Sequence, residues 1–112
     1  MSPVDVVQRQ LVAYNAHDLA AFLATYSETA ELTRVASADP PIRGKSAISE
    51  LYSSKVFNVP GHRAELLGRM AFGNKVVDHE RVFGLRPEPF EAVAVYEVNS
   101  ELIERVWFFA AA

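Results

Sequence analysis

Residues 62–109 read HRAELLGRMAFGNKVVDHERVFGLRPEPFEAVAVYEVNSELIERVWFF, and this stretch decides the fold class. Two-residue turn signals stand at Gly73-Asn74 and Asn99-Ser100, and Arg86-Pro87-Glu88 is typical of a longer turn. These turns divide the stretch into four expected strands, at about 62–72, 75–85, 89–98 and 101–109. Because consecutive strands joined by such short turns run antiparallel, we expect the second half of the chain to be a meander.

The segments before the meander have mostly helical spacing. Ser2-Pro3, with Asp5 in the first turn, is typical of a helix start, and Asp18 can cap a second, short helix. Apolar residues at three- and four-residue steps predict helices, residues 28–34 alternate as a strand, and Asp39-Pro40-Pro41 interrupts regular structure. The expected helices are at about 3–14, 19–26 and 44–57. This order predicts one α+β domain over 1–112, with three N-terminal helices on one face of a mostly antiparallel sheet.

The composition excludes several classes of function. The chain has 112 residues, 50% of them hydrophobic, and a formal net charge of -3 without a basic block, so we expect neither nucleic acid nor a membrane as a partner. It has no cysteine, and its three histidines lack the spacing of a zinc site. We therefore expect no metal and no cofactor. Residues 1–9 have no apolar stretch suited to a signal peptide, and no run approaches the ~20 residues of a membrane helix, so we expect a cytoplasmic protein.

The last two strands of the meander are apolar at both parities, which predicts a sheet that is covered on both faces. The helices cover one face only. The outward side chains would be Val93, Val95, Val106 and Phe108, and these form an apolar patch too large for a monomer. We therefore expect a homodimer.

Three short motifs carry a family resemblance: Ala13-Tyr14-Asn15-Ala16-His17-Asp18-Leu19 at the first helix junction, Arg43-Gly44-Lys45 before the third helix, and the aromatic strand 106–109. With the order of elements over the whole chain, they resemble the NTF2-like superfamily, and within it the SnoaL-like proteins and ketosteroid isomerases. The resemblance implies a cone, in which a curved sheet wraps around the helices and leaves a pocket at its open end. It also implies a homodimer, but the superfamily hosts isomerases, dehydratases, hydrolases, cyclases and non-catalytic modules, so it names no reaction.

The resemblance to ketosteroid isomerases stops short of their catalytic residues. Those enzymes use a tyrosine donor, an aspartate base and a protonated aspartic acid. Matched without gaps, this chain has Gln10, Arg34 and Ala94 at the three positions. None of these side chains performs the corresponding chemistry, so steroid isomerisation by that mechanism is not implied.

The candidate catalytic carboxylates are on the second strand of the meander. Asp78 and Glu80 are two residues apart, so they share a face. In a cone poor in water, repulsion and desolvation would raise the pKa of one carboxyl and make it a suitable general acid or base. Arg34 or Arg105 would then hold the other carboxyl ionised. The alternative is that both carboxylates face solvent beside the basic residues of the same strand.

Arg34 is the third candidate catalytic residue. It stands where the isomerase relatives keep a catalytic group, and a guanidinium there would polarise a carbonyl or bind a ligand carboxylate bidentately. The alternative is an exposed ion pair, which contributes at most ~1 kcal/mol.

The candidate ligand-binding residues are mostly apolar or aromatic, and they are Tyr14, Leu32, Tyr96, Arg105, Trp107 and Phe109. Such a wall would suit a small apolar or aromatic molecule, although aromatic residues on a strand also serve as plain core. Two functions stay open. One is a small-molecule-binding protein that acts as a cofactor-free isomerase, dehydratase or hydrolase, and the other is a non-catalytic ligand-binding or dimeric association module.

Overall fold

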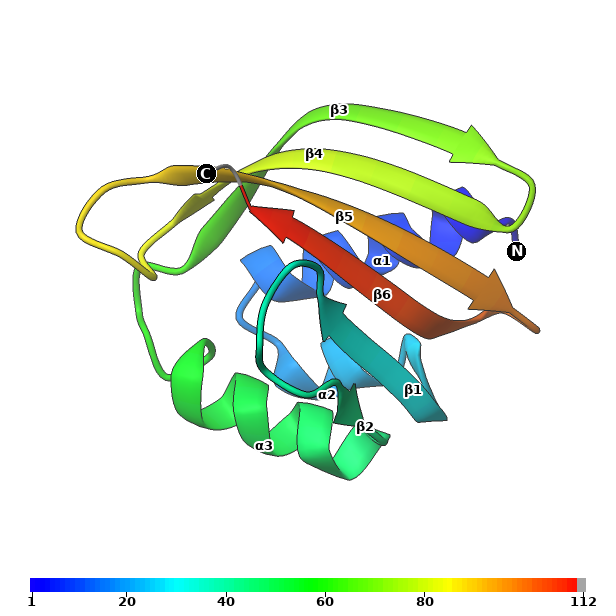
Figure 1. The fold of residues 1–112 in the computed structure, drawn as a ribbon, viewed down its shortest axis with the longest axis horizontal. Helices are drawn as coiled ribbons and strands as arrows, with labels where there is room; N and C mark the ends of the chain where they lie inside the picture. Colours follow the sequence, from blue (N-terminus) through cyan, green and yellow to red (C-terminus); the bar gives the residue numbers. More distant parts are fainter. Residues whose placement is uncertain (111–112) are drawn as a thin grey trace.

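The computed structural model describes residues 1–110, and its helices and strands follow the order expected from the sequence (Figure 1). The N-terminal part comprises α1 (Pro3–Asn15), α2 (Leu19–Leu23), β1 (Tyr26–Arg34), β2 (Ile42–Arg43) and α3 (Lys45–Lys55). The meander follows with β3 (Arg63–Phe72), β4 (Lys75–Phe83), β5 (Phe90–Asn99) and β6 (Leu102–Ala110). The expected α+β class is confirmed.

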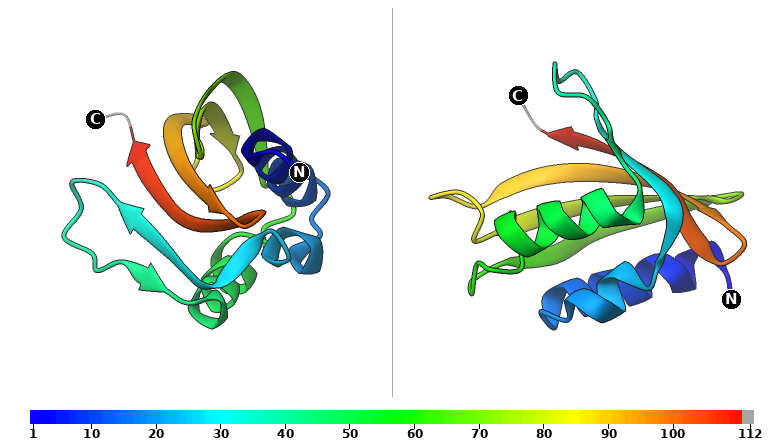
Figure 2. Two further views of the ribbon diagram at one scale, coloured as in Figure 1. Left: turned by 90° about the vertical axis from the view of Figure 1, so that its right-hand side faces the viewer. Right: turned by 90° about the horizontal axis from the view of Figure 1, so that it is seen from below.

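One six-stranded sheet contains all the strands, in the order β2-β1-β6-β5-β4-β3. Each neighbouring pair is antiparallel except β1 and β6, which are parallel. The sheet curves around the helices, as the two turned views in Figure 2 show. The helix α1 packs against β3 to β6, and α3 packs against β1 and β2. The cone with three helices in its concave face is therefore confirmed.

Local sequence signals account for most element boundaries. The Ser2 hydroxyl accepts a hydrogen bond from the backbone N–H of Asp5, and the Asp5 carboxylate accepts one from the backbone N–H of Ser2, which forms a capping box for α1. At the β3–β4 turn, Gly73 has a φ of 59°, which glycine adopts without strain. The β5–β6 turn contains Ser100 and Glu101, both at positive φ, one residue later than expected.

The region between α2 and α3 differs from the expectation in two places. Tyr26, expected on the stripe of the second helix, begins β1 instead, because it pairs with Ile103 of β6 and tertiary pairing overrides helix propensity. The short β2, in a segment expected to be loop, pairs with β1 at Leu32 and Glu31.

A β-bulge in β6 reverses the expected parity of the last strand. Val98 pairs with Ile103, but the preceding residue Glu97 pairs with Arg105, so Glu104 is an extra residue. Because side chains alternate along a strand, one extra residue exchanges the two faces for every residue after it.

The consequence is that Val106 and Phe108 face the helices, whereas Arg105, Trp107 and Phe109 lie on the outer face. Val106 is buried and Phe108 packs against the core. Trp107 pairs with the outward Val95. The expectation that Arg105, Trp107 and Phe109 face the pocket, with Val106 and Phe108 outward, is therefore wrong.

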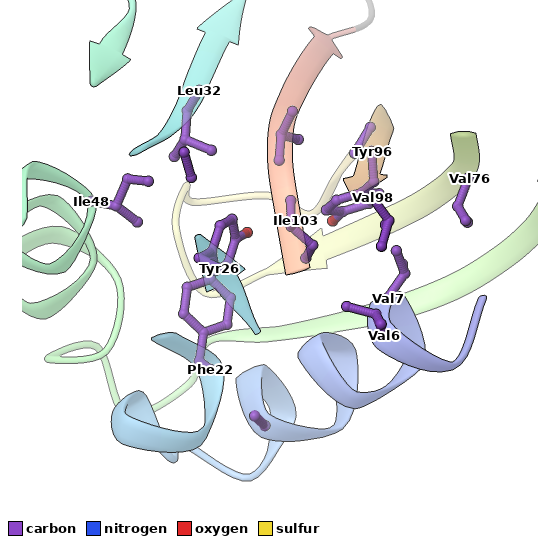
Figure 3. Close-up of a cluster of buried hydrophobic side chains, with 14 residues drawn as sticks. Val6, Val7, Phe22, Tyr26, Leu32, Ile48, Val76, Tyr96, Val98 and Ile103 are labelled. Carbon is purple, nitrogen blue, oxygen red and sulfur yellow. The ribbon is translucent and has the colours of Figure 1, made fainter. Parts of the chain in front are cut away.

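The hydrophobic core fills the space between the sheet and the helices. Side chains from α1, α2 and α3 meet side chains from β1, β4, β5 and β6 in one cluster (Figure 3). The largest of its fully buried members are Tyr26, Phe22, Ile48 and Ile103. Burying such side chains contributes roughly 1.5–3 kcal/mol each, which is the main force that holds the helices in the cone.

Candidate functional site

The polar part of the cone interior lies on β4. The side chains at positions 76, 78 and 80 point inward, and Asp78 is fully buried while Glu80 is partly buried. The two carboxylates therefore share the inner face of the sheet, as expected, and the solvated alternative does not describe Asp78.

The arginine beside these carboxylates is Arg69 of β3, which the sequence reasoning missed. Arg69 lies directly opposite Asp78 in the β3–β4 pair. Its Nε donates to Asp78 Oδ1 at 2.7 Å and its Nη2 donates to Oδ2 at 2.9 Å, which is the bidentate geometry of a strong charge-assisted pair. Its Nη1 also donates to Gln8 Oε1 of α1 at 2.8 Å. The ion pair thus connects the sheet to the first helix.

Glu80 has the perturbed acidity expected of one carboxyl in this pair. The pKa of Glu80 is raised from 4.5 to about 7, first by burial and then by the negative charge of Asp78, while the positive charge of Arg69 partly opposes both effects. At neutral pH this carboxyl is therefore present in both its protonated and its ionised form.

Two tyrosine hydroxyls lie in the same interior, joined by an amide from α1. The Nε2 atom of Gln10 donates to the hydroxyl oxygen of Tyr26 at 3.0 Å and to that of Tyr96 at 3.5 Å. All three residues are buried. Burial raises the pKa of both tyrosines, and the nearby Glu80 raises it further, so both hydroxyls keep their protons at neutral pH. Since the amide occupies an acceptor position on each oxygen, each hydroxyl proton stays available to another acceptor.

Aromatic rings cover the helical side of the interior. Tyr14 lies edge-on to Phe57 at 5.8 Å between centroids, and Phe22 packs against Tyr52 at 4.8 Å. Burial raises the pKa of Tyr14 and of Tyr52, and Glu80 adds to both shifts. The carboxyl of Glu80 thus faces an interior that contains four tyrosines.

The structure brings together about half of the expected site residues. Asp78, Glu80, Tyr14, Leu32 and Tyr96 belong to the cone interior. Arg105, Trp107 and Phe109 lie on the outer face, where Arg105 donates to Glu97. Arg34, 63% exposed at its side chain, lies 3.7 Å from Asp39 instead of inside the cone. Arg34 pairs with the inward-facing Phe108 and so has the expected inward parity, but its side chain is exposed because this end of β1 leads into the loop before β2.

Two hollows on the surface have volumes of about 430 and 250 Å³. The larger lies between α2, β1 and α3, and the smaller lies on the outer face of the sheet beside His79, Glu91 and Phe109. Neither is lined by the inward carboxylates of β4.

Within residues 1–110, no three histidine or acidic side chains are placed to hold a metal ion together. None of the helices in that part of the chain is both long and apolar enough to cross a membrane.

The comparison with known proteins agrees with this geometry. The family model for the SnoaL-like domain matches residues 7–106, so the chain belongs to the SnoaL-like family within the NTF2-like superfamily. No functionally curated protein matches the sequence at a significant level.

Three solved structures illustrate the likeness. An NTF2-like protein of unknown function from Mesorhizobium loti is 18% identical, with a TM-score of 0.85 over 98% of this chain and 91% of that one. A Kribbella flavida protein provisionally named a ketosteroid isomerase is 17% identical, with a TM-score of 0.83 over 96% and 76% of the two chains. A computationally designed 17-OHP binder is 15% identical, with a TM-score of 0.86 over 99% and 92%. At these identities the likeness shows the fold alone.

Proposed function

We propose that the chain binds a small apolar or aromatic molecule in its cone and catalyses a cofactor-free proton transfer on it, as an isomerase, dehydratase or hydrolase. The observation that supports this proposal is the pKa of about 7 for Glu80 in a partly buried site. A carboxyl with a pKa close to neutral both accepts and releases a proton with only a small change in free energy. Membership of the SnoaL-like family and the designed 17-OHP binder of the same fold support a ligand of this kind.

Of the two carboxylates, Glu80 is the proposed base. Asp78 is fully buried and both of its oxygens accept hydrogen bonds from Arg69, so it acts on the reaction through its charge. That charge raises the pKa of Glu80, whereas Arg69 lowers it. The ion pair is therefore a positioning element that sets the acidity of the base.

The tyrosine hydroxyls supply the second half of the proposed chemistry. Glu80 removes a proton from the carbon next to a carbonyl group, and the electron pair moves to the carbonyl oxygen. The hydroxyls of Tyr26 and Tyr96 donate hydrogen bonds to that oxygen, because Gln10 already occupies an acceptor position on each of them. The proton then returns from Glu80 to a carbon atom of the ligand, so Glu80 is again ionised at the end of the cycle.

The test is deuterium exchange at the activated carbon of small cyclic ketones such as 2-tetralone, followed by NMR in heavy water. We expect the wild type to accelerate the exchange, with a rate that rises through pH about 7 as Glu80 ionises. Glu80→Gln should lower the rate at least about 100-fold. The control is Glu65→Gln, which removes an exposed carboxylate that pairs with Arg81. Wild-type exchange rates in Glu80→Gln would refute the assignment of the base.

The non-catalytic module is the second candidate function, and a specific observation favours it. Phe22, Tyr26 and Ile48 project into the cone and are fully buried, and the two hollows described above lie outside it. A module with a packed cone would bind none of the cyclic ketones. If the NMR signals of these ketones did not change on addition of the protein, this second function would be supported.

We also propose that the outer face of the sheet forms a homodimer. Val106 and Phe108, which were expected on the outer face, lie on the inner face of the sheet. The apolar side chains of the outer face are those of Val93, Val95, Trp107, Phe109 and Met70. Of these, Met70 is 61% and Phe109 is 43% exposed, which supports an apolar face that a second copy would cover. Trp107→Glu should produce the monomer mass of 12.4 kDa in light scattering, and a wild type that already has this mass would refute the proposal.

A further inference from the structure

One row of paired residues crosses the inner face of the sheet and ends on an arginine. Asp78 of β4 pairs with Ala94 of β5, and Ala94 pairs with Phe108 of β6. Phe108 in turn pairs with Arg34 of β1. Because directly paired residues have their side chains on the same face of a sheet, the side chain of Arg34 leaves the sheet on the face that also carries Asp78 and Glu80.

Arg34 and Glu80 approach the same end of the cone. The strands β1, β4 and β6 run in the same direction, and each of the two residues lies in the second half of its strand (Figure 1). Glu80 is partly buried, whereas the side chain of Arg34 is 63% exposed. Three strand spacings of ~4.8 Å separate β4 from β1, which is roughly 14 Å along the sheet. The carboxyl is therefore inside the cone and the guanidinium at its rim, with the partly exposed Ala92 and Phe108 between them.

Tyr52 of α3 lies close enough to both charged groups to be affected by each of them. Burial is the main cause of the raised pKa of Tyr52, the negative charge of Glu80 raises it further, and the positive charge of Arg34 lowers it. The rings of Tyr52 and Phe108 both pack against the hydrophobic core. A molecule that reaches from Glu80 to Arg34 therefore meets aromatic side chains on the way, which suits a ring system.

The present partner of Arg34 is weak enough to be replaced by a ligand. Nη1 of Arg34 lies 3.7 Å from Oδ2 of Asp39, which is too long for a hydrogen bond. Both side chains are exposed, and an ion pair of this kind contributes little to stability. A ligand carboxylate can accept two parallel hydrogen bonds from the planar guanidinium, and this bidentate arrangement is stronger.

We infer that the ligand of the cone is a keto acid, in which an aromatic or alicyclic ketone carries a carboxylate at the end remote from the reacting carbon. Arg34 binds the carboxylate at the rim, the ring system lies along Phe108 and Tyr52, and the carbon next to the ketone reaches Glu80. Because an ionised Glu80 repels a carboxylate, the charged end stays at the rim and the ketone enters first. This inference rests on the proposed function and adds the chemical class of the ligand.

The test compares 6-carboxy-2-tetralone with its methyl ester, which has the same ring system and ketone but no charge. Ligand-observed NMR titrations give the dissociation constant of each compound. We expect the acid to bind about tenfold more tightly than the ester, and Arg34→Gln to remove this difference. The control is Arg43→Gln, which removes an exposed guanidinium that pairs with Glu31 and should leave the difference intact. Equal binding of acid and ester by the wild type, or a preference that survives Arg34→Gln, would overturn the inference.

Deuterium exchange of the same two compounds separates this inference from the proposed reaction. If the acid is preferred through Arg34 but neither compound exchanges faster than in buffer, the role of Glu80 as a base fails and carboxylate recognition is supported. If both compounds bind equally and both exchange, the role of Glu80 is supported and carboxylate recognition is overturned. If neither compound binds to the wild type, the inference is overturned together with the proposed reaction, and the module with a packed cone is supported.

Discussion

Replacement of Glu80 by glutamine should stabilise the folded protein at alkaline pH and leave its stability unchanged in acid. Burial and the charge of Asp78 raise the pKa of Glu80 from 4.5 to about 7 in the folded state. The folded state therefore holds a proton that the unfolded state has lost, between pH 4.5 and about 7, and the free energy of unfolding falls as the pH rises through this window. Each unit of pKa difference corresponds to about 1.4 kcal/mol, so the loss amounts to roughly 3 kcal/mol above pH 7.

Glutamine carries no charge at any pH, so Glu80→Gln should avoid this loss. Urea unfolding, followed by the fluorescence of the single tryptophan at a fixed protein concentration, gives the free energy of unfolding of both proteins between pH 4.5 and 8.5. We expect the two values to agree at the acid end and to differ by roughly 3 kcal/mol at pH 8.5, with the variant more stable. Glu65→Gln, on the exposed pair with Arg81, should show no such widening. If the free energies of unfolding of the wild type and Glu80→Gln differed by the same amount at pH 4.5 and at pH 8.5, the inference that burial and Asp78 raise the pKa of Glu80 would be refuted.

Three other predictions concern catalysis, the ion pair and the backbone. The protein should not convert 5-ene to 4-ene 3-ketosteroids above background, because Gln10, Arg34 and Ala94 stand at the three positions from which that mechanism acts, and Glu80, Tyr26 and Tyr96 act from other positions. The absorbance of the conjugated product checks this, and robust turnover would contradict it. Arg69→Met should lower the free energy of unfolding by about 3–5 kcal/mol in urea titrations, since it leaves Asp78 buried without its partner; a loss under 1 kcal/mol, the size expected of an exposed pair, would contradict that reasoning. Gly84→Ala should cost about 2 kcal/mol or more in thermal melts, because Gly84 has a φ of 89° and an added Cβ would lie 2.5 Å from a backbone oxygen; an unchanged melting temperature would contradict it.

The ion pair could have been predicted from the sequence, although the partners expected for the carboxylates were Arg34 and Arg105, which lie on other strands. A two-residue turn at Gly73-Asn74 places residue 72 opposite 75, and counting back three residues on each side places Arg69 opposite Asp78. The structure has this register. Local signals of this kind, like the capping box at Ser2, depend only on neighbouring residues, and for that reason the helices and most strand limits were predictable.

The orientation of β6 was not predictable in the same way. A bulge adds one residue without changing composition, and in a strand that is apolar at both parities no alternation reveals it. The bulge at Glu104 is stabilised from outside the strand, since the Glu104 carboxylate accepts hydrogen bonds from Ser27 and Thr29 of β1. These contacts join segments that are far apart in the sequence. The pairing of Tyr26 with Ile103, which places Tyr26 in a strand, is also a contact of this kind.

The parallel pairing of β1 with β6 determines when the sheet can be completed during synthesis and folding. During synthesis β1 leaves the ribosome long before β6, and until then only the short β2 is available as its partner in the sheet. Non-local pairing of this kind closes late and slows folding, while the open edges of β1 and β5 remain able to pair with other chains. A chain cut before Leu102 lacks β6 and would keep both edges permanently, so such a truncation should produce aggregates instead of a folded domain.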